Sequence, residues 1–180
     1  APTPMLSYAV RRLGCGCGIV ISASHNSGEY NGVKCYGPDG CQMTDEPAAI
    51  VTAKISEIPY FLPEEKSFSE FMAEGLIRYI GQDLWNKYYD TVLAEAIAPE
   101  NIRKADLNIV YTPLCGTGRE PVCEILEKLG VGITMVKCQE MPDGDFKTCE
   151  YPNPETDAAL NESYKIASVT PCDVILGTDP

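Results

Sequence analysis

The chain has 180 residues, 44% of them hydrophobic and 22% charged, a composition that excludes disordered and fibrous proteins. Its 26 acidic and 14 basic residues give a formal net charge of -12, which argues against nucleic acid or an anionic membrane as a partner. No segment approaches the roughly 20 consecutive apolar residues that cross a bilayer. We therefore expect a soluble protein in which any cations that bind an anionic ligand lie close together.

The first part of the chain predicts two helices and a pair of strands. Hydrophobic residues recur at helical spacing over residues 4–13, and short apolar runs at 18–21 and 33–36 predict strands, the first of them buried. A turn signal at 37–40 predicts a returning hairpin strand. Acidic residues and a proline then open a second helix over 44–58.

The middle of the chain predicts a connection between two domains. Residues 59–82 lose hydrophobic periodicity, and residues 83–97 regain it as an amphipathic helix that bridges the domains. We therefore divide the chain into a first domain at 1–58, a connecting region with the bridging helix at 59–98, and a second domain at 99–180.

The last part of the chain alternates strands and helices. Strands are predicted at 107–111, 132–136 and 173–176, and helices at 119–129 and 156–169. This order predicts a parallel sheet with right-handed crossovers. The fold class is therefore α/β, with two incomplete domains whose mixed or parallel sheets are flanked by helices.

Both ends of the sequence suggest a piece of a longer protein. The chain starts at Ala1 without an initiator methionine and stops at Pro180, directly after an apolar strand. The predicted sheet of the second domain keeps an open edge after that strand. We expect the remaining domains of the same polypeptide to be its partners.

The loop after the first strand carries the first candidate site. Ser24 stands there with His25 and Asn26, and Lys34 follows on the next strand. A serine beyond a strand end can be a nucleophile or can carry a phosphate, and a nearby lysine can hold the phosphate or exchange a proton with a sugar hydroxyl. The alternatives are that residues 24–26 form a turn without a catalytic role and that Lys34 is simply an exposed side chain. A Ser-His-Asp triad is disfavoured because His25, the single histidine, is adjacent to Ser24.

Two further clusters follow later strands. Residues 111–119 join a strand to a helix, where backbone amides can bind an anion, and a structural turn is the alternative. At this helix start the thiol of Cys115 could have a lowered pKa, which would suit the nucleophile of a cysteine phosphatase. Three residues separate Cys115 from Arg119, however, and the resemblance to that class would require five. Asp179, at the end of the last strand, suits a hard cation such as Mg²⁺, or caps a turn.

The cysteines favour reduced thiols in the cytoplasm. The chain has nine, and only Cys15 and Cys17 form a close pair. A structural zinc site normally needs four ligands in two close pairs, so a zinc or redox module is the weaker alternative.

Taken together, these segments resemble the α-D-phosphohexomutases. Residues 21–26 (ISASHN) and 30–34 (YNGVK) are similar to the family's T/S-A-S-H-N-P and N-G-x-K motifs. Further segments match the family's motifs in family order, at 3–10, 111–118, 152–155 and 177–180. Ser27 replaces the proline of the first motif, and Cys115 replaces a histidine of the Y-T-P-L-H-G-T-G turn.

The resemblance implies an enzyme that interconverts hexose 1-phosphate and hexose 6-phosphate of glucose or mannose through a phosphoserine and a sugar bisphosphate. Ser24 would be the phosphorylated serine, with His25 near the transferred phosphate and Lys34 handling a hydroxyl proton. Mg²⁺ would bind Ser24, Asp179 and two aspartates outside this chain. Asn26, Asn31 and Gly32 would contact phosphate or substrate.

Three alternatives to a glucose or mannose enzyme stay open. Two belong to the same family, a phosphopentomutase and a phosphoglucosamine mutase. The third is a phosphohydrolase that uses Ser24 or Cys115 and releases inorganic phosphate. We expect the 180-residue chain by itself to have negligible mutase activity, because two aspartates and two domains of the family pattern are missing.

Overall fold

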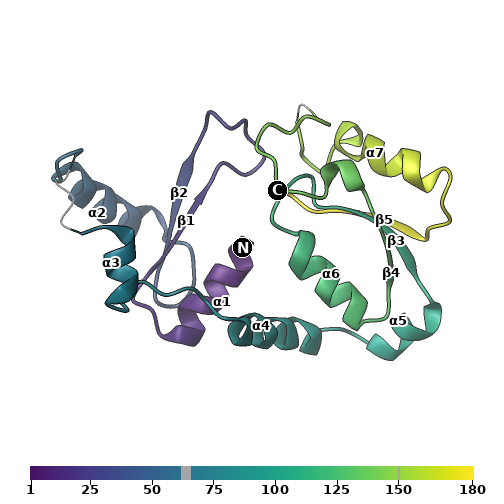
Figure 1. Cartoon of the computed structure of the whole chain (residues 1–180), viewed down its shortest axis with the longest axis horizontal. Helices are drawn as coiled ribbons and strands as arrows, with labels where there is room; N and C mark the ends of the chain where they lie inside the picture. Colours follow the sequence, from purple (N-terminus) through teal and green to yellow (C-terminus); the bar gives the residue numbers. More distant parts are fainter. Residues whose placement is uncertain (62–65, 150) are drawn as a thin grey trace.

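The computed structural model describes residues 1–61, 66–149 and 151–180. Figure 1 shows two α/β parts joined along one side by helix α4 (Gln82–Ala94). The C-terminus lies between the two parts, beside the loop that follows the first strand. This loop and the C-terminus are far apart in sequence, so the fold alone brings them together.

The first part consists of α1 (Thr3–Leu13), the strand pair β1 (Gly18–Ser22) and β2 (Gly32–Tyr36), and α2 (Asp45–Ser56). The strands are antiparallel, with Ser22 opposite Gly32. Helix α1 ends at Gly14, whose left-handed φ of 63° is the conformation that glycine adopts at a helix end. These elements confirm the predicted helices and strands.

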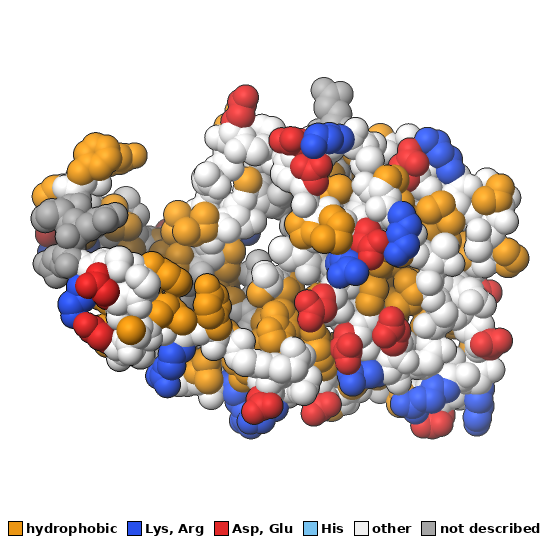
Figure 2. Space-filling view, viewed as in Figure 1, with side chains coloured by type: hydrophobic (Ala, Val, Ile, Leu, Met, Phe, Trp, Pro, Cys, Tyr) orange, Lys and Arg blue, Asp and Glu red, His pale blue; other side chains and the backbone are white. Residues whose placement is uncertain are grey.

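Two expectations for the first part were wrong. Strand β1 is not buried, because Ile21 is 72% exposed on a sheet of only two strands, which has too few neighbours to cover it. The returning hairpin strand is a single bridge between Tyr36 and Gln42. Figure 2 shows hydrophobic side chains exposed over this half of the molecule.

Two short helices, one in the connecting region and one at the start of the second domain, were not predicted from hydrophobic periodicity. Helix α3 (Phe68–Ala73) starts with a capping box of Ser67 and Glu70, and α5 (Pro99–Ala105) starts at a proline. Residues 62–65 of the predicted connecting region lie outside the described residues. Helix α4 lies where a helix was predicted over 83–97, and it contacts α1 in the first part and α6 in the second.

The second part is a three-stranded parallel sheet with helices. It consists of β3 (Asn108–Thr112), α6 (Arg119–Lys128), β4 (Gly132–Met135), a 3₁₀ turn at Lys137–Gln139, α7 (Asp157–Ala167) and β5 (Val174–Gly177). The strand order is β4-β3-β5, with β3 in the middle. The α/β fold class and the predicted parallel sheet are therefore confirmed.

The hydrophobic core of the second part forms between this sheet and α6. Its buried members are Ile109, Tyr111, Leu129 and Val131. None of the helices within the described ranges combines the length and apolar character that a membrane crossing requires.

Candidate functional site

Ser24 lies two residues beyond β1 in a strained backbone conformation. Its φ is 52°, in the left-handed region that non-glycine residues rarely adopt. Its backbone N–H donates a hydrogen bond to the Ser22 hydroxyl over 3.0 Å, which stabilises the turn. Strain of this kind persists only where the surrounding structure imposes it, and it occurs often at functional sites.

Gly32 allows β2 to approach the strand that leads to Ser24. A Cβ atom at this position would lie 2.8 Å from the carbonyl oxygen of Ser22, closer than carbon and oxygen tolerate. The glycine therefore has a structural reason to be there. This close approach fixes the end of β1 and, with it, the start of the loop that presents Ser24.

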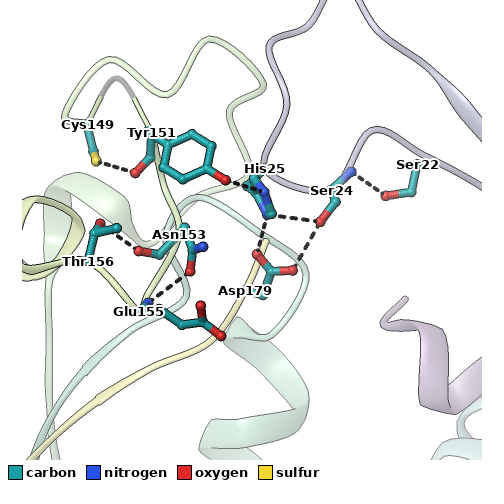
Figure 3. Close-up of polar contacts among 9 residues, drawn as sticks. All are labelled: Ser22, Ser24, His25, Cys149, Tyr151, Asn153, Glu155, Thr156 and Asp179. Atoms are coloured by element: carbon teal, nitrogen blue, oxygen red, sulfur yellow. Dashed lines mark hydrogen bonds and ion pairs between the residues drawn. The ribbon is translucent and has the colours of Figure 1, made fainter.

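The carboxylate of Asp179 meets both Ser24 and His25 (Figure 3). The Ser24 hydroxyl donates to Oδ2 over 3.0 Å, and Nδ1 of His25 lies 3.0 Å from Oδ1. Asp179 is 155 residues from Ser24 in sequence and follows shortly after β5. The structure thus brings together three of the residues that the sequence singled out.

This Ser-His-Asp cluster does not have the geometry of a hydrolase triad. A triad needs one imidazole nitrogen on the serine and the other on the carboxylate. Here Nδ1 faces both, at 3.3 Å from the Ser24 hydroxyl and 3.0 Å from Asp179. Because a carboxylate only accepts hydrogen bonds, Nδ1 carries the hydrogen and offers no lone pair to the serine.

Tyr151 is a site residue that the sequence reasoning missed. Its hydroxyl lies 3.1 Å from Nε2 of His25, and the two rings pack edge to face (Figure 3). Its position directly before the Pro-Asn-Pro-Glu segment at 152–155 was the available signal. That segment was matched as a family motif, but nothing in the sequence connected it with His25.

The turn after β3 holds Asp179 in place by close packing. A Cβ on Gly116 would clash with the backbone of Pro180, and one on Gly118 would clash with the Thr178 hydroxyl. The hydroxyl of Tyr111, a fully buried residue, lies 3.0 Å from that of Thr178, and burial raises the pKa of Tyr111 to about 12. The two glycines therefore let the turn contact both neighbours of Asp179.

The anion site predicted in this turn is not formed by its first amides. The N–H groups of Leu114, Cys115 and Gly116 donate to Thr112, Gln139 and Pro113 respectively, so the protein itself satisfies them. Cys115 is buried, and burial, with Asp143 nearby, raises the pKa of its thiol. The expected lowered pKa was wrong, which argues against Cys115 as a nucleophile.

The remaining predicted site residues stay outside this cluster. Asn26 and Asn31 are exposed in the loop between β1 and β2. Lys34 pairs with Val20 in the sheet and lines a hollow between β2 and α2. Within the described parts of the chain, no hydrogen bond or ion pair connects Lys34 with Ser24, His25 or Asp179.

Ser24 opens into a small hollow between the two parts of the molecule. The hollow has a volume of about 220 Å³. It is lined from the first part by residues that include Ser22 and Ser24, and from the second part by residues that include Cys115, Gly116 and Pro180. The Ser24 side chain is therefore next to a space that both parts form.

The donor atoms at this point partly fit a magnesium ion. The Ser24 hydroxyl and the Asp179 carboxylate supply two oxygens that lie 3.0 Å apart, and oxygen is the donor that Mg²⁺ prefers. Across residues 1–61, 66–149 and 151–180, no group of three or more His, Cys, Asp or Glu side chains is arranged to hold a metal. Two oxygens are a partial set, to which other ligands would have to be added.

Comparison with known proteins identifies both parts of the chain. Residues 1–60 match the family profile "Phosphoglucomutase/phosphomannomutase, alpha/beta/alpha domain I", and residues 86–180 match domain II of the same family. The phosphoglucomutase of Staphylococcus epidermidis is 33% identical over 179 residues, and that of Staphylococcus saprophyticus is 34% identical over 180. Each alignment covers 99% of this chain and 32% of the relative.

Solved structures show the same fold. A Thermus thermophilus protein described as a phosphomannomutase superposes with a TM-score of 0.75 at 23% sequence identity. The superposition covers 99% of this chain and 38% of the Thermus chain. A Burkholderia thailandensis family protein gives 0.63 at 16% identity, covering 91% and 31%. The chain spans about a third of the length of the curated relatives that it matches. The two profile matches, which together cover most of the sequence, show that this chain belongs to the phosphoglucomutase/phosphomannomutase family.

Proposed function

We propose that, in the intact protein, Ser24 carries a phosphoryl group and exchanges it with a hexose phosphate. The observation that carries this proposal is the convergence of a strained serine and a carboxylate, with the Ser24 hydroxyl 3.0 Å from Asp179 Oδ2. Family membership supports it, because the similar relatives are phosphoglucomutases. The proposed reaction interconverts hexose 1-phosphate and hexose 6-phosphate, with glucose or mannose as the sugar.

The reaction proceeds in two transfers through Ser24. Phosphoserine first gives its phosphoryl group to the free hydroxyl of the sugar phosphate, and the hydroxyl proton leaves as the new ester bond forms. The resulting sugar bisphosphate turns in the site and returns its other phosphoryl group to the Ser24 oxygen. Phosphate is therefore conserved in the sugar, and positioning and charge neutralisation supply most of the catalysis.

The surrounding residues take roles that follow from their positions. Ser22 holds the turn at Ser24, and His25 offers its Nδ1 hydrogen beside the serine oxygen. We propose that Lys34 exchanges the proton of the sugar hydroxyl. Lys34 has no contact with the Ser24 cluster within the described residues, so we assign it to the sugar and not to the serine. We assign contact with the phosphate or the substrate to Asn26 and Asn31 in the loop and to Gly32 at the start of β2.

Magnesium is the proposed cofactor, and Ser24 and Asp179 are its ligands from this chain. When bound, the ion would neutralise negative charge on the phosphoryl oxygens. The further oxygen ligands would come from the part of the polypeptide that the relatives have in addition. The cytoplasm is the proposed location, because a cytoplasm keeps thiols reduced and all nine cysteines are free.

The test separates a mutase from a phosphohydrolase. The intact protein is supplied with glucose 1-phosphate, a trace of glucose 1,6-bisphosphate and Mg²⁺, and both glucose 6-phosphate and inorganic phosphate are measured. We expect glucose 6-phosphate without release of phosphate, and loss of this activity in Ser24→Ala but not in Ser27→Ala. Stoichiometric release of inorganic phosphate would instead assign the site to a phosphohydrolase.

A further inference from the structure

The imidazole of His25 is held from both of its nitrogens by the second part of the molecule. Nδ1 lies 3.0 Å from Asp179 Oδ1, and Nε2 lies 3.1 Å from the Tyr151 hydroxyl. The Tyr151 ring also packs against the imidazole at a centroid distance of 5.0 Å and an angle of 80°. Two independent contacts therefore connect Tyr151 with His25 (Figure 3).

The segment that carries Tyr151 is itself anchored. Its carbonyl oxygen accepts from the Cys149 thiol over 3.1 Å and from the backbone N–H of Asn153 over 2.9 Å. Pro152, the next residue, is fully buried. The buried Gln139 reaches the same segment through the Thr148 hydroxyl over 3.1 Å. Tyr151 thus presents its hydroxyl from a fixed backbone.

The contact with Asp179 selects one tautomer of the imidazole. Asp179 can only accept, so the hydrogen is on Nδ1, and Nε2 then has a lone pair that accepts from the Tyr151 hydroxyl. In this tautomer the Nδ1 hydrogen points between Asp179 and the Ser24 oxygen, which lies 3.3 Å away. His25 is then a hydrogen-bond donor toward Ser24 and not a base for it.

We propose that Tyr151 is a positioning residue that fixes the ring orientation of His25 and so keeps its Nδ1 hydrogen beside Ser24. This inference rests on the proposed function, because the donor that Tyr151 keeps beside Ser24 would face the phosphoryl group there. Within the described residues, Tyr151 has no hydrogen bond to Ser24 or Asp179, so its effect passes through His25.

The chain offers a direct test because His25 is its only histidine. The ¹⁵N and ¹H resonances of a single imidazole report which nitrogen carries the hydrogen and whether the other nitrogen accepts a hydrogen bond. The test variant is Tyr151→Phe, which removes the hydroxyl and keeps the ring. Tyr164→Phe is the matched control, because it removes a partly exposed hydroxyl bonded to Asp157 on the same half of the molecule.

We expect the Nδ1–H tautomer in the unmodified chain and in Tyr164→Phe. In Tyr151→Phe the Nε2 resonance should shift because this nitrogen loses its hydrogen bond, while Nδ1 should keep the hydrogen because Asp179 can only accept. Tyr151→Leu, which also removes the edge-to-face contact, should broaden or shift the ring carbon-bound hydrogens further. An unchanged Nε2 resonance in Tyr151→Phe, or an Nε2–H tautomer in the unmodified chain, would overturn the inference.

A second measurement separates this inference from the proposed function. The rate at which Ser24 gains phosphate from glucose 1,6-bisphosphate is compared in the intact protein and its Tyr151→Phe variant. We expect a rate about fivefold lower in the variant, the equivalent of one lost hydrogen bond of about 1 kcal/mol. An equal rate in a protein whose Ser24 is phosphorylated would overturn the positioning role. A Ser24 that gains no phosphate in either protein would overturn the proposed function, while the resonances still decide the role of Tyr151.

Discussion

At Ser24 a hydroxyl, a carboxylate and an imidazole meet because short backbone features hold each of them. Ser22 stabilises the left-handed turn at Ser24, and Gly32 lets the neighbouring strand approach the same point. Asp179 arrives from the end of β5, packed against a turn with two glycines. The geometry of the site therefore depends on residues that do not contact the Ser24 hydroxyl.

Gly32→Ala tests this dependence in the first part of the molecule. The added Cβ would lie 2.8 Å from the Ser22 carbonyl oxygen, a backbone atom that cannot turn away. We expect the free energy of unfolding to fall by about 1–3 kcal/mol, as for overpacking elsewhere. Chemical denaturation measures this change.

Gly16→Ala is the control for Gly32→Ala, because a Cβ on Gly16 would have no heavy atom within 4 Å. Its free energy of unfolding should stay within about 0.5 kcal/mol of the unmodified chain. Equal stability of the two variants would show that β2 does not need the close approach.

Cys115 provides a second test at this scale. Burial raises the pKa of its thiol, so at neutral pH less of it is in the reactive thiolate form than for an ordinary cysteine. We expect iodoacetamide to modify the exposed Cys17 well before Cys115, as measured by peptide mass spectrometry. Faster modification of Cys115 would return a cysteine phosphohydrolase to consideration.

The sequence predicted individual site residues better than their partners. Ser24, His25 and Asp179 were recognised from their places after strands and from family motifs, and the structure joins them by hydrogen bonds. Tyr151 was missed because its contact with His25 spans 126 residues and leaves no periodic signal. The thiol of Cys115 was misjudged because a helix start suggests a lowered pKa, whereas burial dominates.

At the scale of elements, the turn from β3 to α6 is the support of the C-terminal strand. Gly118→Ala would bring a Cβ to 2.5 Å from the Thr178 hydroxyl and 2.7 Å from that of Tyr111. We expect the end of β5 to shift and the free energy of unfolding to fall by about 1–3 kcal/mol.

Two measurements check the Gly118→Ala expectation. Chemical denaturation gives the stability, and the His25 resonances report whether Asp179 still contacts the ring. Gly144→Ala is the matched control, because a Cβ there would have no heavy atom within 4 Å. Unchanged His25 resonances in Gly118→Ala would contradict the role of this turn in placing Asp179.

The stability of helix α3 is expected to depend on pH. Hydrogen bonds from the backbone and side chain of Ser67 lower the pKa of Glu70. Because the folded pKa is lowered, the capping box is at full strength above the ordinary value of 4.5 and is lost as pH falls through the lower folded value. Amide hydrogen exchange in α3, corrected for intrinsic rates, should show this loss of protection. In the Glu70→Gln variant, the corrected amide hydrogen exchange in α3 should instead vary little over the same pH range.

Elements with long-range hydrophobic patterns were predictable, and short ones were not. The parallel sheet followed from alternating strands and helices between 107 and 176, where burial fixes the pattern. Helices α3 and α5 have only six and seven residues, too few for a periodic signal, and only local cues such as Ser67, Glu70 and Pro99 mark them. The exposure of β1 depends on how many strands its sheet contains, which no local pattern encodes.

At the scale of the whole molecule, the site lies between two parts of one polypeptide. The hydrogen bonds of Ser24 and His25 to Asp179 cross this boundary, and α4 joins the parts along one side. With a formal net charge of -12, the molecule offers no general attraction for a phosphosugar. Under the proposed function, binding of the phosphosugar therefore depends on local groups around Ser24.

The central claim is that Ser24 carries the phosphoryl group, and intact-mass analysis of the full-length protein tests it most directly. After incubation with glucose 1,6-bisphosphate and Mg²⁺, we expect one phosphate mass increment in the unmodified protein and in Ser27→Ala, and none in Ser24→Ala. An increment that persists in Ser24→Ala would contradict the claim.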